Sequence, residues 1–230
     1  MNKVYLIIPA AGSGTRMGGS VNKLFLEVKG VPVITRTLRA FAACADLADI
    51  EAVVVTGEDN IPPITSIVEK EGFSFVKRVV PGGNTRTESV YKGFLAVKDL
   101  GAREDDCVFV HDGARCMVDR TVFSNCLAGL QRNPVCVAAV KAKNTIKILE
   151  NGFVSFTPRR DDLAEIQTPQ CFRLKVLEES YDLAIKDNLE ATDDTSLSEH
   201  AGYKTLVVEG SYSNIKITTP EDIRIAESLV

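Results

Sequence analysis

Short apolar runs alternate with stretches of helical periodicity along much of the chain. The runs are rich in β-branched residues and have the length of buried strands. They lie at 4–8, 51–56, 73–80, 107–110 and 135–140. Between them, apolar positions recur at helical spacing after Pro32, Pro62, Thr85 and Asp119. Such alternation predicts an α/β protein with a mostly parallel sheet, right-handed crossovers and helices on both faces.

Between residues 141 and 169 the pattern changes to β-branched stretches around Asn151-Gly152, which is a strong hairpin signal. The charged run 159–162 follows. This segment is expected to protrude as an arm, because its pattern differs from that of a further strand-helix unit. An exposed, strand-rich arm commonly pairs, most economically with a second copy of itself. The sequence therefore predicts one domain over 1–230, with 141–169 as a dimerisation arm, and a homodimer.

The last part of the chain returns to helical stripes and short apolar runs. A polar, turn-like stretch at 191–196 separates two of the helices that it predicts. The predicted elements are helices over 173–186 and 197–201, short strands over 204–209 and 214–217, and a closing helix that begins at Thr219-Pro220.

Composition and charge narrow the function classes. The 230 residues are 45% hydrophobic and 25% charged, as in ordinary globular proteins. The net charge of -4 argues against a broad nucleic-acid-binding or anionic-membrane surface, which needs a basic footprint. The apolar opening at 4–11 is too short for a membrane helix and has no signal-peptide cleavage pattern. The six scattered cysteines form no C-x-x-C pair, so we expect reduced core thiols and a cytoplasmic protein.

A glycine-rich loop at 9–17 follows the first predicted strand. Its small residues let backbone N–H groups approach a ligand, and Arg16 and Lys23 add positive charge, which favours a phosphate-rich guest. The alternative is a tight turn with solvated charges. The dinucleotide fingerprint is excluded because Met17 stands where its third glycine belongs, and the P-loop is excluded because Gly19-Ser20 has no intervening lysine.

Two more polar loops follow predicted strands. In the first, Thr85 is expected to cap a helix and Glu88 to complete a capping box, a role that needs no ligand. In the second, Asp112 directly follows a strand and can hold a hydrated Mg²⁺ or a ribose hydroxyl, while Arg115 faces another anion. A local ion pair is the alternative for these two residues. Because ligands bind beyond the carboxyl ends of parallel strands, the three loops predict a shared pocket.

Three further residues are ambiguous from the pattern alone. Lys216 lies between two isoleucines of a predicted strand, so it is either solvated or directed at substrate. His111 is expected to be structural and Cys116 to be a spectator thiol.

Taken together, these motifs closely resemble the 2-C-methyl-D-erythritol 4-phosphate cytidylyltransferases of the non-mevalonate isoprenoid pathway, over essentially the whole chain. The motifs are Pro9-Ala10-Ala11-Gly12-x-Gly14-x-Arg16-Met17 with Lys23, Gly82-Gly83-x-x-Arg86-x-x-Ser89, His111-Asp112-x-Ala114-Arg115, Thr168-Pro169-Gln170 and Asn214-Ile215-Lys216. The chain departs from the usual family pattern at Asn84, Gly113, Cys116 and Asn144.

The resemblance implies a Rossmann-like nucleotidyltransferase fold, a dimer made through the arm, and Mg²⁺-dependent transfer of CMP from the co-substrate CTP. It assigns catalytic roles to Arg16 and Lys23, at the triphosphate, and to Arg160 and Lys216, at the acceptor. The implied CTP site comprises Pro9, Ala10, Ala11, Gly12, Gly14, Gly83, Asn84, Ser89 and Asp112, with Asp112 also near the metal. The remaining implied acceptor residues are Arg115, Thr145, Thr168 and Thr192, and the alternative acceptor is ribitol or another pentitol 5-phosphate.

Overall fold

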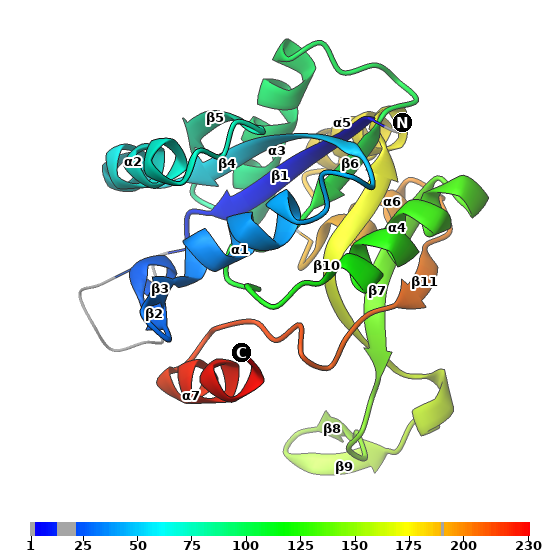
Figure 1. Cartoon of the computed structure of the whole chain (residues 1–230). Coiled ribbons are helices and arrows are strands. Elements are labelled where there is room, and N and C mark those ends of the chain that lie inside the picture. Colours follow the sequence, from blue (N-terminus) through cyan, green and yellow to red (C-terminus); the bar gives the residue numbers. More distant parts are fainter. Residues whose placement is uncertain (1–2, 13–21, 190) are drawn as a thin grey trace.

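The computed structural model of the protein describes residues 3–12, 22–189 and 191–230. Its centre is a seven-stranded sheet (Figure 1). The strands are β1 (Lys3–Ala10), β4 (Asp49–Thr56), β5 (Val76–Pro81), β6 (Cys107–Val110), β7 (Val135–Lys141), β10 (Ala164–Arg173) and β11 (Leu206–Glu209), in the spatial order β11-β7-β10-β6-β1-β4-β5. All neighbouring pairs are parallel except those of β10, which runs antiparallel to β6 and β7. The predicted mostly parallel α/β sheet is confirmed.

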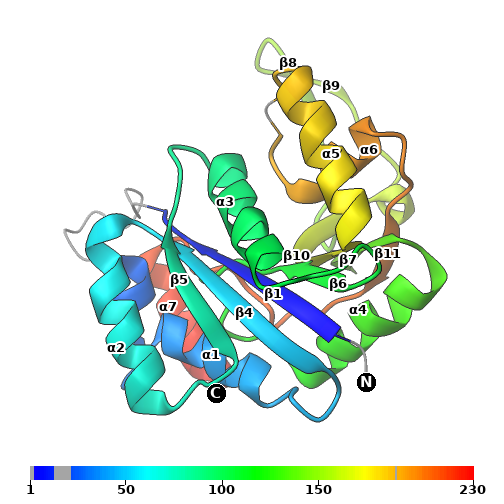
Figure 2. The same cartoon turned by 90° about the horizontal axis from the view of Figure 1, so that it is seen from above.

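Helices cover both faces of this sheet, as Figure 2 shows from above. One face carries α1 (Val33–Ala42), α2 (Ile61–Glu71), α4 (Arg120–Arg132) and α7 (Pro220–Leu229); the other carries α3 (Arg86–Asp99), α5 (Leu174–Lys186) and α6 (Asp194–His200). Successive side chains of a strand point to opposite faces. In β1, Leu6 and Ile8 therefore join the first core and Tyr5 and Ile7 the second. Both faces are buried, which explains the continuous apolar run.

Short elements surround the central sheet. They are the hairpin β2 (Glu27–Val28) and β3 (Val31–Pro32), the hairpin β8 (Ile148–Glu150) and β9 (Phe153–Phe156), and 3₁₀ helices at Lys23–Phe25, Glu58–Asn60 and Arg160–Asp162. The predicted cap of the closing helix is confirmed, since Thr219 and Asp222, on either side of Pro220, form a capping box at its start. Within the described ranges, no helix is long and apolar enough to cross a membrane.

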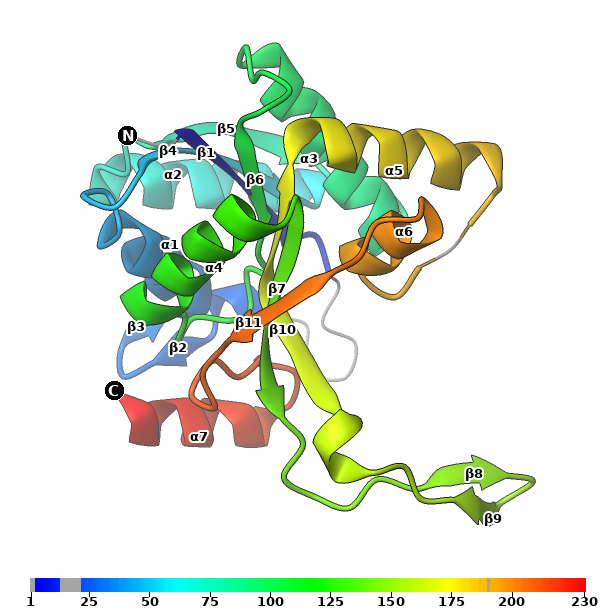
Figure 3. The same ribbon diagram turned by 90° about the vertical axis from the view of Figure 1, so that its right-hand side faces the viewer.

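The β8–β9 hairpin extends away from the sheet, as Figure 3 shows. Its turn lies at Asn151 and Gly152, whose φ angles of 51° and 85° fit an Asn-Gly turn. Large apolar side chains along it are exposed, above all Phe153 at 79%. The predicted hairpin is therefore confirmed. The expected arm of 141–169 also includes the first half of β10, which returns to the sheet at Ala164.

Several sequence expectations were wrong in detail. Residues 214–217 form no strand, because the Ile217 amide bonds to the Ala114 carbonyl of a loop and the segment joins no sheet. α6 begins at Asp194 instead of 197, because Asp193 caps it through a bond from the Ser196 amide. The third strand begins at Val76, not 73, since the Val76 amide still bonds to Phe73 in a turn.

Candidate active site

The carboxyl ends of β1, β5 and β6 surround a cavity of about 440 Å³. Of the predicted site residues, it brings together Pro9, Ala10, Ala11, Gly12, Lys23, Gly83, Asn84, Ser89, Asp112 and Lys216. Gly14 and Arg16 lie outside the described residues. The expected shared pocket at this edge of the sheet is thus present, and we call it the nucleotide cavity after the role that the resemblance implies.

A second cavity, of about 550 Å³, lies beside the first one. It includes four residues that the resemblance assigned to the acceptor, namely Arg115, Thr168, Thr192 and Lys216. Arg86, Asp112 and Lys216 line both cavities, so the two spaces meet at these side chains. We call the second space the acceptor cavity.

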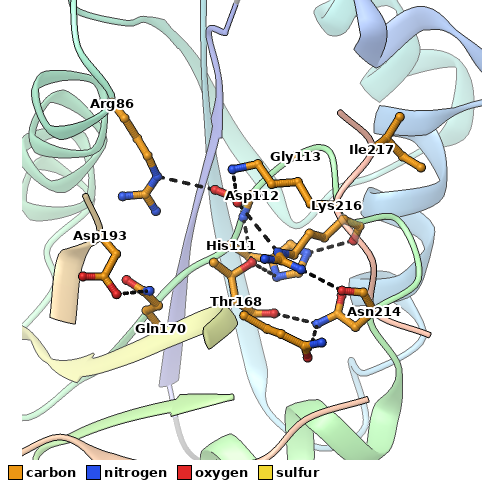
Figure 4. Close-up of polar contacts among 12 residues, drawn as sticks. Arg86, His111, Asp112, Gly113, Thr168, Gln170, Asp193, Asn214, Lys216 and Ile217 are labelled. Carbon is orange, nitrogen blue, oxygen red and sulfur yellow. Dashed lines mark hydrogen bonds and ion pairs between the residues drawn. The ribbon is translucent and has the colours of Figure 1, made fainter. Parts of the chain in front are cut away.

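Asp112 is the centre of this junction (Figure 4). Its carboxylate lies 2.7 Å from Lys216 Nζ, 3.5 Å from Arg86 Nε and 3.7 Å from Arg115 Nε. Burial by itself raises the pKa of a carboxyl group, but the charges of Lys216 and Arg86 outweigh it and lower the pKa of Asp112 to about 2. Asp112 is therefore ionised at neutral pH and gathers three cations around one carboxylate.

His111 holds the loop that carries Asp112. It is fully buried, and burial lowers its pKa to about 4, so the ring is neutral at physiological pH. Nε2 lies 3.0 Å from the Arg115 carbonyl oxygen, which can only accept, so Nε2 carries the proton and Nδ1 accepts from the Thr168 hydroxyl at 3.1 Å. The Thr168 oxygen in turn accepts from the Asp112 amide. The ring and the threonine therefore act on the site by positioning Asp112.

Lys23 lies at the start of a 3₁₀ helix that Asn22 caps through its side chain. Its Nζ donates to the Ile217 carbonyl at 3.0 Å, and the Ile217 amide donates to the Ala114 carbonyl. The segment around Lys216 is thereby held against the loop after β6. These hydrogen bonds explain how Lys216, which lies near the end of the chain, reaches Asp112.

The loop between β5 and α3 is held by its own side chains. The Gly83 amide donates to Ser89 Oγ at 3.0 Å, and the Ser89 hydroxyl donates to the Thr85 carbonyl at 2.8 Å. Thr85 caps α3 as predicted, but Glu88 accepts from the Asn84 amide where a full capping box would use the Thr85 amide. A Cβ on Gly83 would lie 2.3 Å from Glu88 Cβ, so only glycine fits this tight turn.

Thr145 and Arg160 are not brought into either cavity by this single chain. Both are exposed beside the hairpin. Arg160 donates to the Lys143 carbonyl at 3.4 Å within the same segment. Their implied role at the acceptor stays a prediction.

Reasoning from the sequence gave no role to Arg86, Gln170 or Asp194. Arg86 belongs to the Gly82-Gly83-x-x-Arg86-x-x-Ser89 motif. Its place in the first turn of the predicted helix could have indicated a role in the site. Gln170 Oε1 accepts from the Asp194 amide at 2.8 Å and Gln170 Nε2 donates to Asp193, which fixes the start of α6. No spacing in the sequence reveals that pairing, because β10 and α6 are far apart along the chain.

Asp112, the carboxylate where the two cavities meet, is the candidate metal ligand of the site. In the described part of the chain, no group of three or more His, Cys, Asp and Glu side chains is placed to hold a metal ion. Mg²⁺ is commonly held by one or two carboxylates together with substrate phosphates. Asp112 alone is therefore compatible with a metal that a triphosphate brings with it, and incompatible with a site made wholly of protein ligands.

Comparison with known proteins agrees with this geometry. The family model for 2-C-methyl-D-erythritol 4-phosphate cytidylyltransferase matches residues 4–230. Relatives of that name from Clostridium novyi and Geobacter metallireducens are 39% and 40% identical, over 100% and 99% of this chain and 97% of each relative. A solved 4-diphosphocytidyl-2C-methyl-D-erythritol synthase from Anaerococcus prevotii has a TM-score of 0.81 at 33% identity, over 99% of this chain and 98% of its own. The cytidylyltransferase from Thermus thermophilus has a TM-score of 0.78 at 31% identity, over 100% and 98%. The chain belongs to the 2-C-methyl-D-erythritol 4-phosphate cytidylyltransferase family and is an enzyme of the nucleotidyltransferase class.

Proposed function

We propose that this protein transfers CMP from CTP to 2-C-methyl-D-erythritol 4-phosphate, giving 4-diphosphocytidyl-2-C-methyl-D-erythritol and pyrophosphate, a step of non-mevalonate isoprenoid synthesis. The observation that carries the proposal is the pair of cavities that meet at Arg86, Asp112 and Lys216. One cavity has the glycine-rich loops that suit a nucleotide, and the other has hydroxyl and guanidinium groups that suit a polyol phosphate. Family membership supports the same pair of substrates.

The chemistry needs no nucleophile from the protein. The second pKa of a phosphate monoester is about 6, so the acceptor phosphate is largely dianionic at neutral pH. One of its oxygens forms a bond to the α-phosphorus of CTP, and the bond from that phosphorus to the bridging oxygen breaks, so pyrophosphate leaves with the electron pair. Asp112, with its pKa lowered to about 2, and the neutral, fully bonded His111 are poor candidates for a general base.

The protein's contribution is electrostatic. Two anions must approach in line, and negative charge builds up on the α-phosphate oxygens as they react. Lys216, Arg86 and Arg115 lie at or beside the junction, and Lys23 lines the nucleotide cavity. Cations that are already fixed by hydrogen bonds and ion pairs stabilise such charge without reorganising during the reaction.

We also propose that the reaction uses Mg²⁺, held by Asp112 and substrate phosphates. The ionised state of Asp112 and its position in the wall of both cavities support this assignment. The metal would neutralise triphosphate charge and aid departure of pyrophosphate. Lys216 and Arg86 keep the carboxylate in place before substrates bind.

We propose further that the active form is a cytoplasmic homodimer. The exposed apolar side chains of β8 and β9, among them Leu149, Phe153 and Phe156, form a surface that a second copy would cover. Thr145 and Arg160 lie in the same segment, outside this chain's own cavities, so pairing of two arms would deliver them to an acceptor cavity. Six cysteines without a disulfide fit a reducing compartment.

The proposed function is tested by pyrophosphate release with defined acceptors. Purified protein with CTP and Mg²⁺ is expected to release pyrophosphate rapidly with 2-C-methyl-D-erythritol 4-phosphate. With ribitol 5-phosphate, the alternative that family membership does not favour, the rate should be at least about tenfold lower, because the pentitol is one carbon longer along its chain and lacks the methyl branch. Equal rates, or faster release with the pentitol, would reassign the acceptor.

A further inference from the structure

Arg86 is the first residue of α3 and lines both cavities. Its Nη2 lies 2.7 Å from Asp194 Oδ2, and its Nε lies 3.5 Å from Asp112 Oδ1. A guanidinium carries five N–H donors in a plane, so two carboxylate contacts leave donors that remain for a ligand. The Arg86 side chain is also 28% exposed, which makes it accessible from the cavities.

Asp194 is buried behind this arginine. Its side chain is only 1% exposed, and the Tyr181 hydroxyl donates to its Oδ1 at 3.0 Å. Burial raises the pKa of Asp194, and the charge of Arg86 opposes that rise. A carboxylate is costly to bury unless it is paired, and here Arg86 is the paired cation. The acid is therefore arranged to hold the guanidinium.

Tyr181 connects this acid to the helix that carries Arg86. Its ring belongs to α5 and lies 5.2 Å from the ring of Tyr91 and 6.0 Å from that of Phe94, both on α3. The same side chain thus packs against α3 and donates the hydrogen bond to Asp194. A buried side chain with these contacts has little rotamer freedom, which fixes the direction of the acid.

We propose that Arg86 is a further substrate-contacting residue, which binds phosphate oxygens where the two cavities meet, and that Asp194 and Tyr181 are positioning residues that hold its guanidinium there. The planar fork of an arginine matches two oxygens of one phosphate, whereas the ammonium of Lys216 offers a point charge. This inference rests on the proposed function, because it assigns a role within the same site.

The test is a double-mutant cycle between Arg86→Lys and Tyr181→Phe, with kcat/KM from pyrophosphate release as the readout. Tyr181→Phe removes the hydroxyl that donates to Asp194, the acid behind Arg86. It should lower kcat/KM roughly tenfold, as expected for loss of a hydrogen bond to a charged group. Arg86→Lys keeps the charge but loses the fork, and roughly a 10- to 100-fold loss is expected. In the Arg86→Lys background, Tyr181→Phe should change kcat/KM less than twofold, because the two residues act as one unit.

Tyr203→Phe is the matched control. It removes a hydroxyl that donates to Glu179 on α5, outside the described linings of the two cavities, and it should leave kcat/KM unchanged. The positioning role is supported if Tyr181→Phe lowers kcat/KM at least fivefold in the unchanged protein and less than twofold in the Arg86→Lys variant. Any other pattern overturns the positioning role. A different outcome would count against the proposed function itself: no pyrophosphate release by the unchanged protein with CTP and the methylerythritol phosphate.

Discussion

Replacing Lys216 with methionine removes one charge from the wall between the cavities while keeping most of the side chain's length. Lys216 Nζ lies 2.7 Å from Asp112 Oδ2. At an effective dielectric constant of about 20, unit charges at that separation attract by about 6 kcal/mol. The Lys216 side chain is 37% exposed, so solvent screening reduces the attraction. We expect the ammonium to stabilise the reacting phosphate by about half of this attraction, about 3 kcal/mol. Lys216→Met removes that stabilisation and should lower kcat/KM roughly 10²-fold.

The assay for Lys216→Met is the initial rate of pyrophosphate release with the acceptor varied at saturating CTP. Lys216→Arg, which keeps the charge, should retain more activity than Lys216→Met. Lys175→Met removes a lysine from a surface pair with Glu104 and should have no effect on the rate. A loss below threefold for Lys216→Met, or the same loss for Lys175→Met, would refute the electrostatic account of the junction.

Three other changes test separate parts of the structure. Lys23→Ala should lower kcat/KM by roughly 10²- to 10⁴-fold through loss of a fixed cation in the nucleotide cavity, measured by pyrophosphate release; a change under threefold would remove Lys23 from the mechanism. Phe153→Asp should convert a dimer to a monomer by light scattering, and an unchanged mass would contradict pairing through the hairpin. Burial lowers the pKa of His111 to about 4, so below about pH 6.5 the unfolded chain binds a proton that the folded protein does not. The free energy of unfolding, measured in urea, should therefore fall by about 2 to 3 kcal/mol between pH 7 and pH 4.5 because of this group. This fall should disappear in His111→Gln, and parallel pH dependences for both proteins would contradict the prediction.

The alternating part of the chain was predictable from its sequence because most of its strands, namely β1, β4, β6 and β7, are buried on both faces and its helices carry apolar stripes. Such runs stand out from their surroundings, and β6 matches the expected range of 107–110. The Asn151-Gly152 turn was equally clear, since its left-handed backbone leaves few alternatives.

β10 was missed because its sequence has no alternation that distinguishes it from the neighbouring arm. Its first residues are exposed and its last ones buried, and it contains Pro169 and a register shift between Ile166 and Gln170. Only the pairing with β6 and β7, which no local pattern encodes, makes this segment a strand of the central sheet.

That candidate residues would line a shared cavity was predictable where a motif holds them next to a strand end, as for Asp112 and Gly83. The position of Lys216 required the structure, because the Lys23–Ile217 and Ile217–Ala114 hydrogen bonds hold its segment beside Asp112. Asp194 could not be predicted, since its partners Arg86 and Tyr181 come from two other helices.

The central claim is that two phosphate compounds meet at Asp112, Arg86 and Lys216 and react directly with each other. The most direct measurement is a single turnover with CTP labelled with ³²P at the α-phosphate, quenched at short times and separated into protein and small molecules. We expect label to pass from CTP straight to the methylerythritol phosphate product, in step with pyrophosphate release. Label that first appeared on the protein, or that was released as CMP without entering the acceptor, would contradict it.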